Sequence, residues 1–362
     1  MNDMDRPHGI IPFEQLNLDG QRVLLMGGAG FIGHHLALAL RAKGADVMVI
    51  DNLQINNIVK IVSDRRLDET RRRLYVNFLL DRFSLMREAG IRTESVDCRQ
   101  MVELTSLFND FMPTKAVHLA AISSAVIANQ TPGLAYDLQI STLRNLLELC
   151  RLGDSACDRV AFMSSSTVYG DFDGDAVDEQ IRPRPRGVYA NGKYIGERMV
   201  REASTLYGLD YSIIRPSALY GIRCISGRVS QKFVENALFG SPLKLEGGGS
   251  GRLDFTNIED LVRGIILALF LEGGRSRTFN ITYGNARTIA DLAEIIKAYF
   301  PKAKIEESPA ATEKPKRGTL LVDRARKYLG FEPQIPLEVG YRAYCEWFLA
   351  EWDKVQSGRL GQ

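Results

Sequence analysis

A tyrosine and a lysine four positions apart are the side chains of this sequence best suited to proton transfer. Tyr189 and Lys193 belong to the segment YANGK, and residues four apart lie on the same face of a helix. An ordinary tyrosine, with a pKa of about 10, is a weak base near pH 7, but a neighbouring ammonium group favours the phenolate form. A phenolate can remove the proton of a secondary alcohol while a hydride leaves the adjacent carbon. Tyr189 is therefore the candidate base, and Lys193 is its candidate partner.

A run of hydroxyl side chains supplies a third candidate for this chemistry. The segment SSSTVYG at 164–170 follows the apolar run 160–163, which has the pattern of a buried strand. Ligands bind at the carboxyl edge of a parallel sheet, and that is where such a segment would lie. We expect Ser165 to hydrogen-bond the reacting oxygen, close to a nicotinamide ring that accepts the hydride. Lys193 would also hold the ribose of that nicotinamide.

A glycine-rich turn near the N-terminus predicts the cofactor. Gly27, Gly30 and Gly33 follow an apolar strand and open a helix, and their spacing allows a tight turn, close approach of a pyrophosphate and close packing of helix on strand. Asp51 ends the second predicted strand, 18 residues after Gly33. A carboxylate there accepts the ribose hydroxyls of NAD and repels the 2′-phosphate of NADP, so NAD is the expected cofactor. Asp97, at the end of a third strand, is a candidate adenine contact, with a solvated loop as the alternative.

The elements that must position these residues follow a regular order along the chain. The strands are expected at 23–26, 47–50, 116–119, 160–163 and 211–214, with helices at 31–43 and 138–149. Continuous apolar strands separated by helices predict an α/β fold, a doubly wound parallel sheet that is covered on both faces.

Three stretches lie outside this regular order of strands and helices: a leader, an insertion and the C-terminal part. They define the expected domains. Residues 1–20 are predicted to be a polar leader, 21–220 the cofactor-binding domain, and 221–362 a smaller substrate-binding α/β lobe that is interleaved with the first domain. A stretch at about 53–95 is longer than a simple crossover requires. It is rich in arginine, and we interpret it as an amphipathic helical insertion with a solvated basic face. A cap over the active site or an interface element is the alternative.

Composition excludes several other classes of protein. The 46 Lys and Arg residues almost balance the 44 Asp and Glu residues, so neither a nucleic acid nor a membrane surface is an expected partner. The longest apolar run, 265–271, is too short to span a bilayer. Five cysteines without a CxxC pair and only four histidines make a disulfide framework or a metal site unexpected. A cytoplasmic location is expected.

Over residues 21–350 the chain resembles the extended short-chain dehydrogenase/reductase family, in its nucleotide-sugar epimerase/dehydratase branch. The motifs that carry the resemblance are GGAGFIG at 27–33, DNL at 51–53, HLAA at 118–121, SSSTVYG at 164–170, YANGK at 189–193, RPSALYG at 215–221 and DFTNIEDL at 254–261. The resemblance implies a Rossmann domain with bound NAD, a smaller domain for a nucleotide sugar, and a homodimer formed by helices near 138–150 and 190–206. It assigns Ser165, Tyr189 and Lys193 as the catalytic residues. The implied cofactor contacts are Gly27, Gly30, Phe31, Ile32, Gly33, Asp51, Asn52, Asp97, Ala120, Ala121, Tyr189, Lys193, Pro216 and Ser217.

Two positions of the resemblance indicate which reaction follows the oxidation. In the similar 4,6-dehydratases, Asp and Glu follow the catalytic Ser or Thr, and in the UDP-xylose-forming decarboxylases a Glu precedes the Val-Tyr-Gly; here these places hold Ser166 and Thr167. The segment is more similar to the 4-epimerases of UDP-glucose and UDP-glucuronate. We therefore expect an epimerase acting at C4. A dehydratase or decarboxylase with other acid and base residues, a net dehydrogenase that releases NADH, and an NAD-bound scaffold are the alternatives.

The expected substrate contacts depart from the family pattern. Leu253 stands where relatives carry an arginine that contacts the diphosphate, and Ala218 stands where they often carry Asn or Thr. These differences suggest an atypical nucleotide sugar or a non-sugar alcohol. The candidate substrate residues are Ser123, Ser166, Thr167, Arg228, Arg252 and Arg317.

Overall fold

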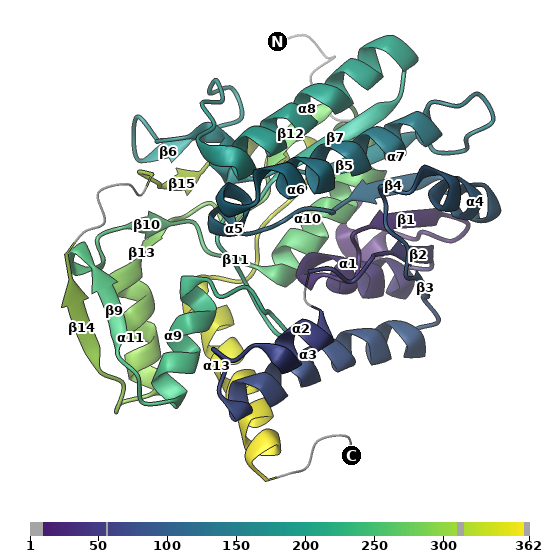
Figure 1. Cartoon of the computed structure of the whole chain (residues 1–362). Coiled ribbons are helices and arrows are strands. Elements are labelled where there is room, and N and C mark those ends of the chain that lie inside the picture. Colours follow the sequence, from purple (N-terminus) through teal and green to yellow (C-terminus); the bar gives the residue numbers. More distant parts are fainter. Residues whose placement is uncertain (1–9, 56, 310–314, 358–362) are drawn as a thin grey trace.

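Seven parallel strands form the central sheet of the protein (Figure 1). The computed structural model describes residues 10–55, 57–309 and 315–357. The strand order β12-β7-β5-β4-β1-β2-β3 confirms the predicted doubly wound parallel sheet. Every strand pairs in parallel with its neighbours because the apolar runs are buried on both faces. The strands are β1 (Arg22–Met26), β2 (Asp46–Ile50), β3 (Arg92–Glu94), β4 (Lys115–His118), β5 (Arg159–Met163), β7 (Asp210–Arg215) and β12 (Arg277–Asn280).

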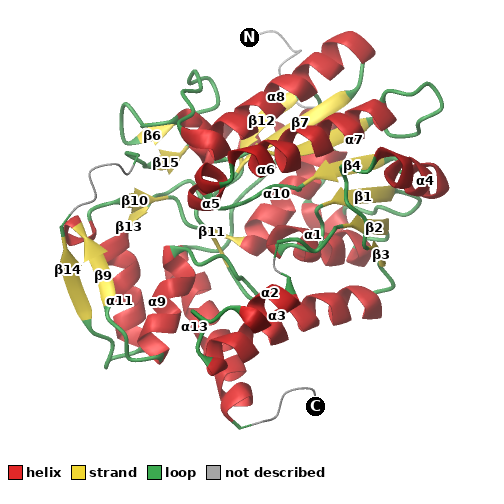
Figure 2. Cartoon of the chain, viewed as in Figure 1, coloured by secondary structure: helices red, strands yellow, loops and turns green. Residues whose placement is uncertain are grey.

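Helices cover both faces of this sheet (Figure 2). Alternate side chains of each strand point to opposite faces, so Val23 and Leu25 of β1 join one apolar core and Leu24 and Met26 the other. The first core contains residues of α1 (Phe31–Ala42), α10 (Ile258–Phe270) and α12 (Asp323–Leu329). The second contains residues of α4 (Met101–Phe111), α7 (Thr142–Cys150) and α8 (Gly187–Tyr207).

A smaller lobe lies beyond the carboxyl edge of the sheet. Its own apolar core is built mainly from α9 (Val229–Leu238), α11 (Ile289–Tyr299) and α13 (Leu337–Gln356), beside the parallel pair β9 (Leu243–Glu246) and β14 (Ile305–Ser308). Three short strand pairs lie between the lobe and the sheet: β8 (Leu219–Tyr220) with β11 (Thr256–Asn257), β10 (Arg252–Leu253) with β13 (Arg287–Thr288), and β6 (Ala176–Val177) with β15 (Thr319–Leu320). The short helices α5 (Ala125–Gln130) and α6 (Pro132–Tyr136) precede α7.

The arginine-rich stretch between β2 and β3 folds as α2 (Ile58–Ser63) and the long helix α3 (Glu69–Glu88). The two ends of α3 belong to different cores. Tyr75 and Phe78 pack in the core of the smaller lobe, whereas Met86, with Phe83 beside it, packs in the core of the large sheet. Figure 1 shows α3 running from α13 to a position below the sheet. The stretch is therefore a structural connection between the two lobes.

Parts of the predicted leader and of the predicted second domain pack against the large sheet. Residues 1–9 of the predicted leader lie outside the described residues, and Leu16 and Leu18 of the same segment are buried against the large sheet. Beyond residue 221 the chain returns to the large sheet, where it contributes β12 and α10. The two parts of the chain are thus interleaved in space.

Candidate active site

The turn between β1 and α1 requires glycine at two of its predicted positions. Gly27 has a φ of +77°, and a Cβ there would lie 2.6 Å from the backbone of Ala120. A Cβ on Gly33 would lie 2.2 Å from the carbonyl oxygen of Gly28. Gly30, the N-cap of α1, has no side chain to cap the first turn of the helix, so the turn can offer its N–H groups to an anion. This cradle fits the diphosphate of a dinucleotide.

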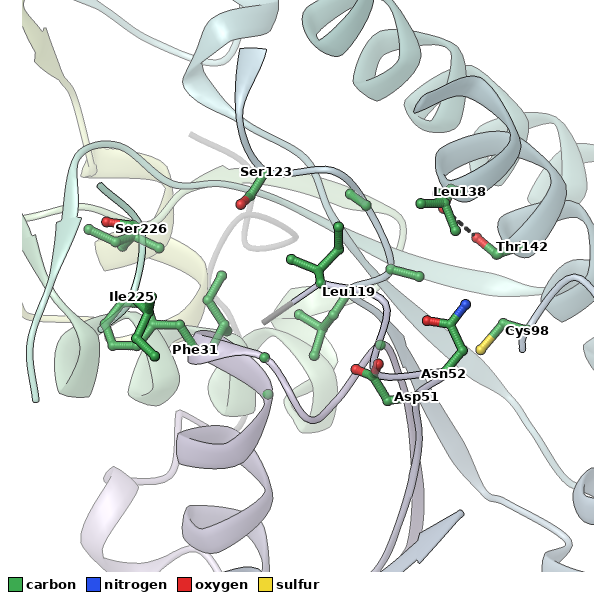
Figure 3. A pocket seen from close by; sticks show the side chains of 18 of the residues that line it. Phe31, Asp51, Asn52, Cys98, Leu119, Ser123, Leu138, Thr142, Ile225 and Ser226 are labelled. Atoms are coloured by element: carbon green, nitrogen blue, oxygen red, sulfur yellow. Dashed lines mark hydrogen bonds between the residues drawn. The ribbon is translucent and has the colours of Figure 1, made fainter. Parts of the chain in front are cut away.

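A cavity lies at this turn (Figure 3). It brings together twelve of the predicted residues: Gly27, Gly30, Phe31, Ile32, Gly33, Asp51, Asn52, Asp97, Ala120, Ala121, Ser123 and Arg228. Sequence reasoning missed the remaining lining residues, which are Ile55, Cys98, Leu119, Leu138, Thr142, Leu219, Cys224, Ile225 and Ser226. Leu119 and Cys98 adjoin predicted contacts and could have been found from that position. Leu219 belongs to the motif RPSALYG, and the remaining residues lie outside the quoted motifs.

Asp51 faces the cavity and also holds the turn in place. One carboxylate oxygen accepts the backbone N–H of Ala29 at 3.0 Å, and the other accepts that of Leu53 at 2.9 Å. Burial raises the pKa of Asp51, while these two bonds and the nearby Arg82 guanidinium oppose the rise. Each oxygen keeps a further lone pair, so the carboxylate can still accept ribose hydroxyls.

Asp97 lies at the same end of the cavity, but neighbouring side chains occupy its carboxylate. The Arg99 guanidinium donates to one of its oxygens at 3.0 Å and to the other at 2.6 Å, and Asn52 donates to one at 3.0 Å. The Arg99 hydrogen bonds hold the pKa of Asp97 low, at about 2. Next to it, burial raises the pKa of the Cys98 thiol to about 12, which makes this cysteine a poor nucleophile. Asp97 thus fixes the position of Asn52 at the cavity wall.

Lys193 is buried below Tyr189 on one face of α8. Its ammonium nitrogen donates to the carbonyl oxygen of Met163 at 2.7 Å and lies 6.0 Å from the centre of the Tyr189 ring. Burial lowers the pKa of Lys193 to about 7. Tyr189 is half-buried and packs against a small apolar cluster that includes Leu138, a residue of the cavity lining. Neither Tyr189 nor Lys193 is itself among the lining residues.

Two glycines allow α8 to approach the sheet closely enough to place this pair. A Cβ on Gly196 would lie 2.3 Å from the Phe162 ring of β5, and one on Gly192 would lie 2.8 Å from the Gln139 side chain. The Lys193 nitrogen lies 5.3 Å from the centre of the same Phe162 ring. A larger residue at Gly196 would push the helix away from β5, and one at Gly192 would push it away from the helical segment Asp137–Ser141.

Ser165 is held as a hydrogen-bond acceptor at the start of the 3₁₀ turn Ser166–Tyr169. Its hydroxyl oxygen accepts the N–H of Thr167 at 3.2 Å and the Thr167 hydroxyl at 3.0 Å. Because Ser165 is the acceptor in both bonds, its own hydroxyl proton can be donated to a substrate oxygen. Thr167 thereby orients Ser165.

A buried ion pair joins the segments that carry the catalytic candidates. Glu197, one turn after Lys193 on α8, accepts from Arg215 at 2.8 Å and 2.6 Å and from the hydroxyl of Ser164 at 2.6 Å. Arg215 also lies over the ring of Tyr169, and its pKa is raised by the hydrogen bonds to Glu197 against the effect of burial. The network links α8, the end of β7 and the serine turn.

The remaining predicted residues lie outside the cavity lining, and all but Arg252 contact or adjoin the serine turn. The N–H of Ser166 donates to the carbonyl of Pro216 at 2.9 Å, and Ser217 is nearly buried beside it. Arg317 donates to the carbonyls of Ser166 at 3.3 Å and Gly170 at 2.7 Å, so it supports the turn from behind. Arg252 lies exposed on β10 and donates to the carbonyl of Ala286 at 3.4 Å.

Comparison with known proteins places this geometry in context. A sequence model of the NAD-dependent epimerase/dehydratase family matches residues 23–282. UDP-glucuronate 4-epimerase 1 of Arabidopsis thaliana is 28% identical over 352 residues, which cover 91% of this chain and 77% of the relative. The crystal structure of the UDP-glucose 4-epimerase of Thermus thermophilus with NAD is 26% identical with a TM-score of 0.75, and that of the Thermotoga maritima enzyme with UDP-glucose is 25% identical with a TM-score of 0.76. Each match covers 91% of this chain and 99% of the other.

Proposed function

The chain belongs to the NAD-dependent epimerase/dehydratase family, and on this premise we propose that it is an NAD-dependent epimerase that inverts C4 of a nucleotide sugar. The names of its relatives support this activity, since the curated and solved proteins with the most similar sequences include 4-epimerases of UDP-glucuronate and UDP-glucose. The departures at Leu253 and Ala218 favour an atypical nucleotide sugar, with a non-sugar alcohol as the alternative.

The observation that carries the proposal is the absence of an acid from the serine turn. Elimination of water needs an acid and a base next to the oxidised sugar, but residues 164–170 contain no carboxylate. Thr167 is used to orient Ser165, and the nearby Glu197 is fully buried and bonded to Arg215 and Ser164. Thr167 has no acidic group, and three hydrogen bonds occupy the carboxylate of Glu197, so neither side chain is available as the acid. Epimerisation requires no such group, because it only reverses the oxidation from the other face of the sugar.

NAD fits the cavity for reasons that lie in this chain. Gly27 and Gly33 leave room for a diphosphate, the uncapped start of α1 offers N–H groups to it, and Asp51 presents carboxylate oxygens to a ribose. A 2′-phosphate would meet the charge of Asp51, which favours NAD over NADP. When bound, NAD accepts a hydride from the sugar carbon and returns it.

Three side chains of the protein carry out the proton transfer: Tyr189, Lys193 and Ser165. Tyr189 removes the proton from the hydroxyl at the reacting carbon and returns it after the keto sugar has rotated in the site. The Lys193 ammonium nitrogen, 6.0 Å from the Tyr189 ring, favours the phenolate form of this base. The Ser165 hydroxyl donates to the developing carbonyl oxygen, with Thr167 fixing its direction. Pro216 and Ser217 are proposed to border the nicotinamide.

The proposed assembly is a homodimer in the cytoplasm. Ile195 and Leu206 expose apolar side chains on α8, one of the two helices through which the family resemblance implies dimerisation. All five cysteines are buried and free, which suits a reducing compartment. In the part of the chain that the structure describes, no helix is long and apolar enough to cross a membrane. Light scattering of the purified protein measures the assembly directly.

The test is a substrate panel followed by NMR. The purified protein is incubated with UDP-, dTDP-, GDP- and CDP-sugars, and anomeric protons, product mass and absorbance at 340 nm are recorded. A new anomeric signal at unchanged mass and unchanged absorbance is the expected result. Loss of water or carbon dioxide would move the protein to the lyases of the family, and accumulated NADH would make it a net dehydrogenase. Tyr189→Phe serves as the inactive control.

A further inference from the structure

One segment of the smaller lobe crosses over the predicted dinucleotide site. Residues 222–228, here called the strap, follow β8 and contribute Cys224, Ile225, Ser226 and Arg228 to the cavity lining. Figure 3 shows Ile225 and Ser226 beside Phe31, across the cavity from Asn52 and Cys98. At its end, the Arg228 guanidinium donates to the carbonyl of Ser123 at 3.1 Å, in the segment after β4 that also lines the cavity. The strap is therefore tied to a second segment of the cavity lining.

The first half of the strap is held by α1 and α3. The His35 ring nitrogen Nε2 lies 3.2 Å from the carbonyl of Ile222, and the Arg82 guanidinium donates to the carbonyl of Arg223. Arg223 in turn donates from Nε to Nε2 of His34 at 3.2 Å. Burial lowers the pKa of both histidines, to about 3 for His35, so both rings are neutral and His34 can accept this bond.

The second half of the strap is held by one side chain of α9. The carbonyl oxygen of the Gln231 side chain accepts the N–H groups of Ser226 at 2.6 Å and Gly227 at 3.0 Å. The amide nitrogen of Gln231 donates to Glu235 at 2.6 Å and to the Tyr75 hydroxyl at 3.0 Å. The same hydroxyl donates to Glu235 at 2.6 Å. All three side chains are buried, so Gln231 has a fixed orientation.

Both sets of contacts lead back to α3. Tyr75 and Arg82 lie two turns apart on this helix, whose ends are packed in the two separate cores. Arg82 is fully buried, and its Nε and Nη1 atoms have no hydrogen-bond partner within the described residues. An incompletely paired guanidinium in the interior destabilises a fold, so an apolar residue of the same length would suit the core better. The contact that Arg82 does make is the one to the strap.

We propose that Arg82, Tyr75 and Gln231 are positioning residues that hold the strap across the dinucleotide and thereby keep the cofactor bound through repeated turnovers. This inference rests on the proposed function. An epimerase reduces its cofactor in the first half of each cycle and must still hold it for the second half. A helix packed in both lobes suits this task, because opening the strap then requires movement of α3 or loss of its hydrogen bonds.

The test measures cofactor retention, which does not depend on activity. Wild type, Arg82→Met and Gln231→Met are purified, loaded with NAD and diluted, and the bound NAD is quantified over time after rapid filtration. Each variant should release NAD about tenfold faster or more, the change expected when one such hydrogen bond is lost. Arg82→Met should also unfold at the same temperature as wild type or higher. Arg73→Met is the matched control, since Arg73 is exposed on the same helix and should leave the release rate unchanged.

The outcomes distinguish an effect of the strap from an effect on Asp51. Unchanged release in both variants overturns the proposal. Faster release in Arg82→Met alone also overturns it, because Arg82 is near Asp51 and could act through that carboxylate, whereas the hydrogen bonds of Gln231 go to the strap, Tyr75 and Glu235. Should either variant fail to fold, Tyr75→Phe removes a single hydroxyl and must still accelerate release. A wild type that binds no NAD contradicts the proposed function itself. If the wild type retains NAD but converts no sugar, the proposed function fails, and the release measurements still decide the proposal on the strap.

Discussion

Replacing Glu197 by glutamine should lower the free energy of unfolding by about 3–5 kcal/mol, the range observed when one partner of a buried ion pair is removed. The Glu197 side chain is completely buried, and its carboxylate accepts two hydrogen bonds from Arg215 and one from Ser164, all between 2.6 and 2.8 Å. A glutamine keeps one acceptor oxygen but turns an NH₂ group towards a donor of Arg215. It therefore loses a charge-assisted hydrogen bond and leaves the guanidinium without a counter-charge in the interior.

The magnitude can be checked with a small set of variants unfolded in urea at pH 7. Ser164→Ala removes only the neutral donor and should cost about 1 kcal/mol, well below Glu197→Gln. The double variant Glu197→Leu/Arg215→Met removes both charges and should recover most of the loss. A Glu197→Gln protein within about 1 kcal/mol of wild type, or a double variant as unstable as the single one, would refute the reasoning.

Three further changes have expected outcomes. Tyr189→Phe should lower kcat about 100-fold or more, as loss of a general base does, while the NAD content of the purified protein stays the same; an active variant would remove Tyr189 from its role. Lys193→Met should stabilise the fold by about 2–4 kcal/mol at pH 6, because below the folded-state pKa of about 7 the wild type buries an ammonium group. The gain should shrink as the pH rises towards 10, where the lysine is neutral in the folded protein. A pH-independent gain, measured by unfolding at several pH values, would contradict this. Gly33→Ala, with its Cβ 2.2 Å from the Gly28 carbonyl, should cost about 1–3 kcal/mol and reduce NAD binding, measured by urea unfolding and NAD content.

The parts of the fold that follow from local pattern were predictable. The apolar runs specify the strands, and the spacing of Gly27, Gly30 and Gly33 specifies the turn at the start of α1, because Gly27 needs a positive φ and Gly33 packs against the Gly28 carbonyl. The same holds for Tyr189 and Lys193, since helical spacing alone places them on one face.

The contacts between distant segments were not predictable. Arg317 was expected to contact the substrate, and that role stays a prediction, but its hydrogen bonds in the structure support the serine turn 147 and 151 residues away. Glu197 carries no visible signal, because its importance depends on Arg215 arriving from another strand. The strap has no motif, and its place over the cavity results from packing of the smaller lobe.

The position of α3 in two cores also constrains how the chain can be made. Leu74 and Phe78 are synthesised early, yet they pack beside Tyr344 and Phe348 of α13, about 270 residues later. At a synthesis rate of about 5–20 residues per second, their apolar face has no final partner for about 15–55 seconds after leaving the ribosome. The glycine turn and β1 can form during that time, but the first half of α3 must wait for α13. The packing of α3 is therefore completed only after α13 has been synthesised.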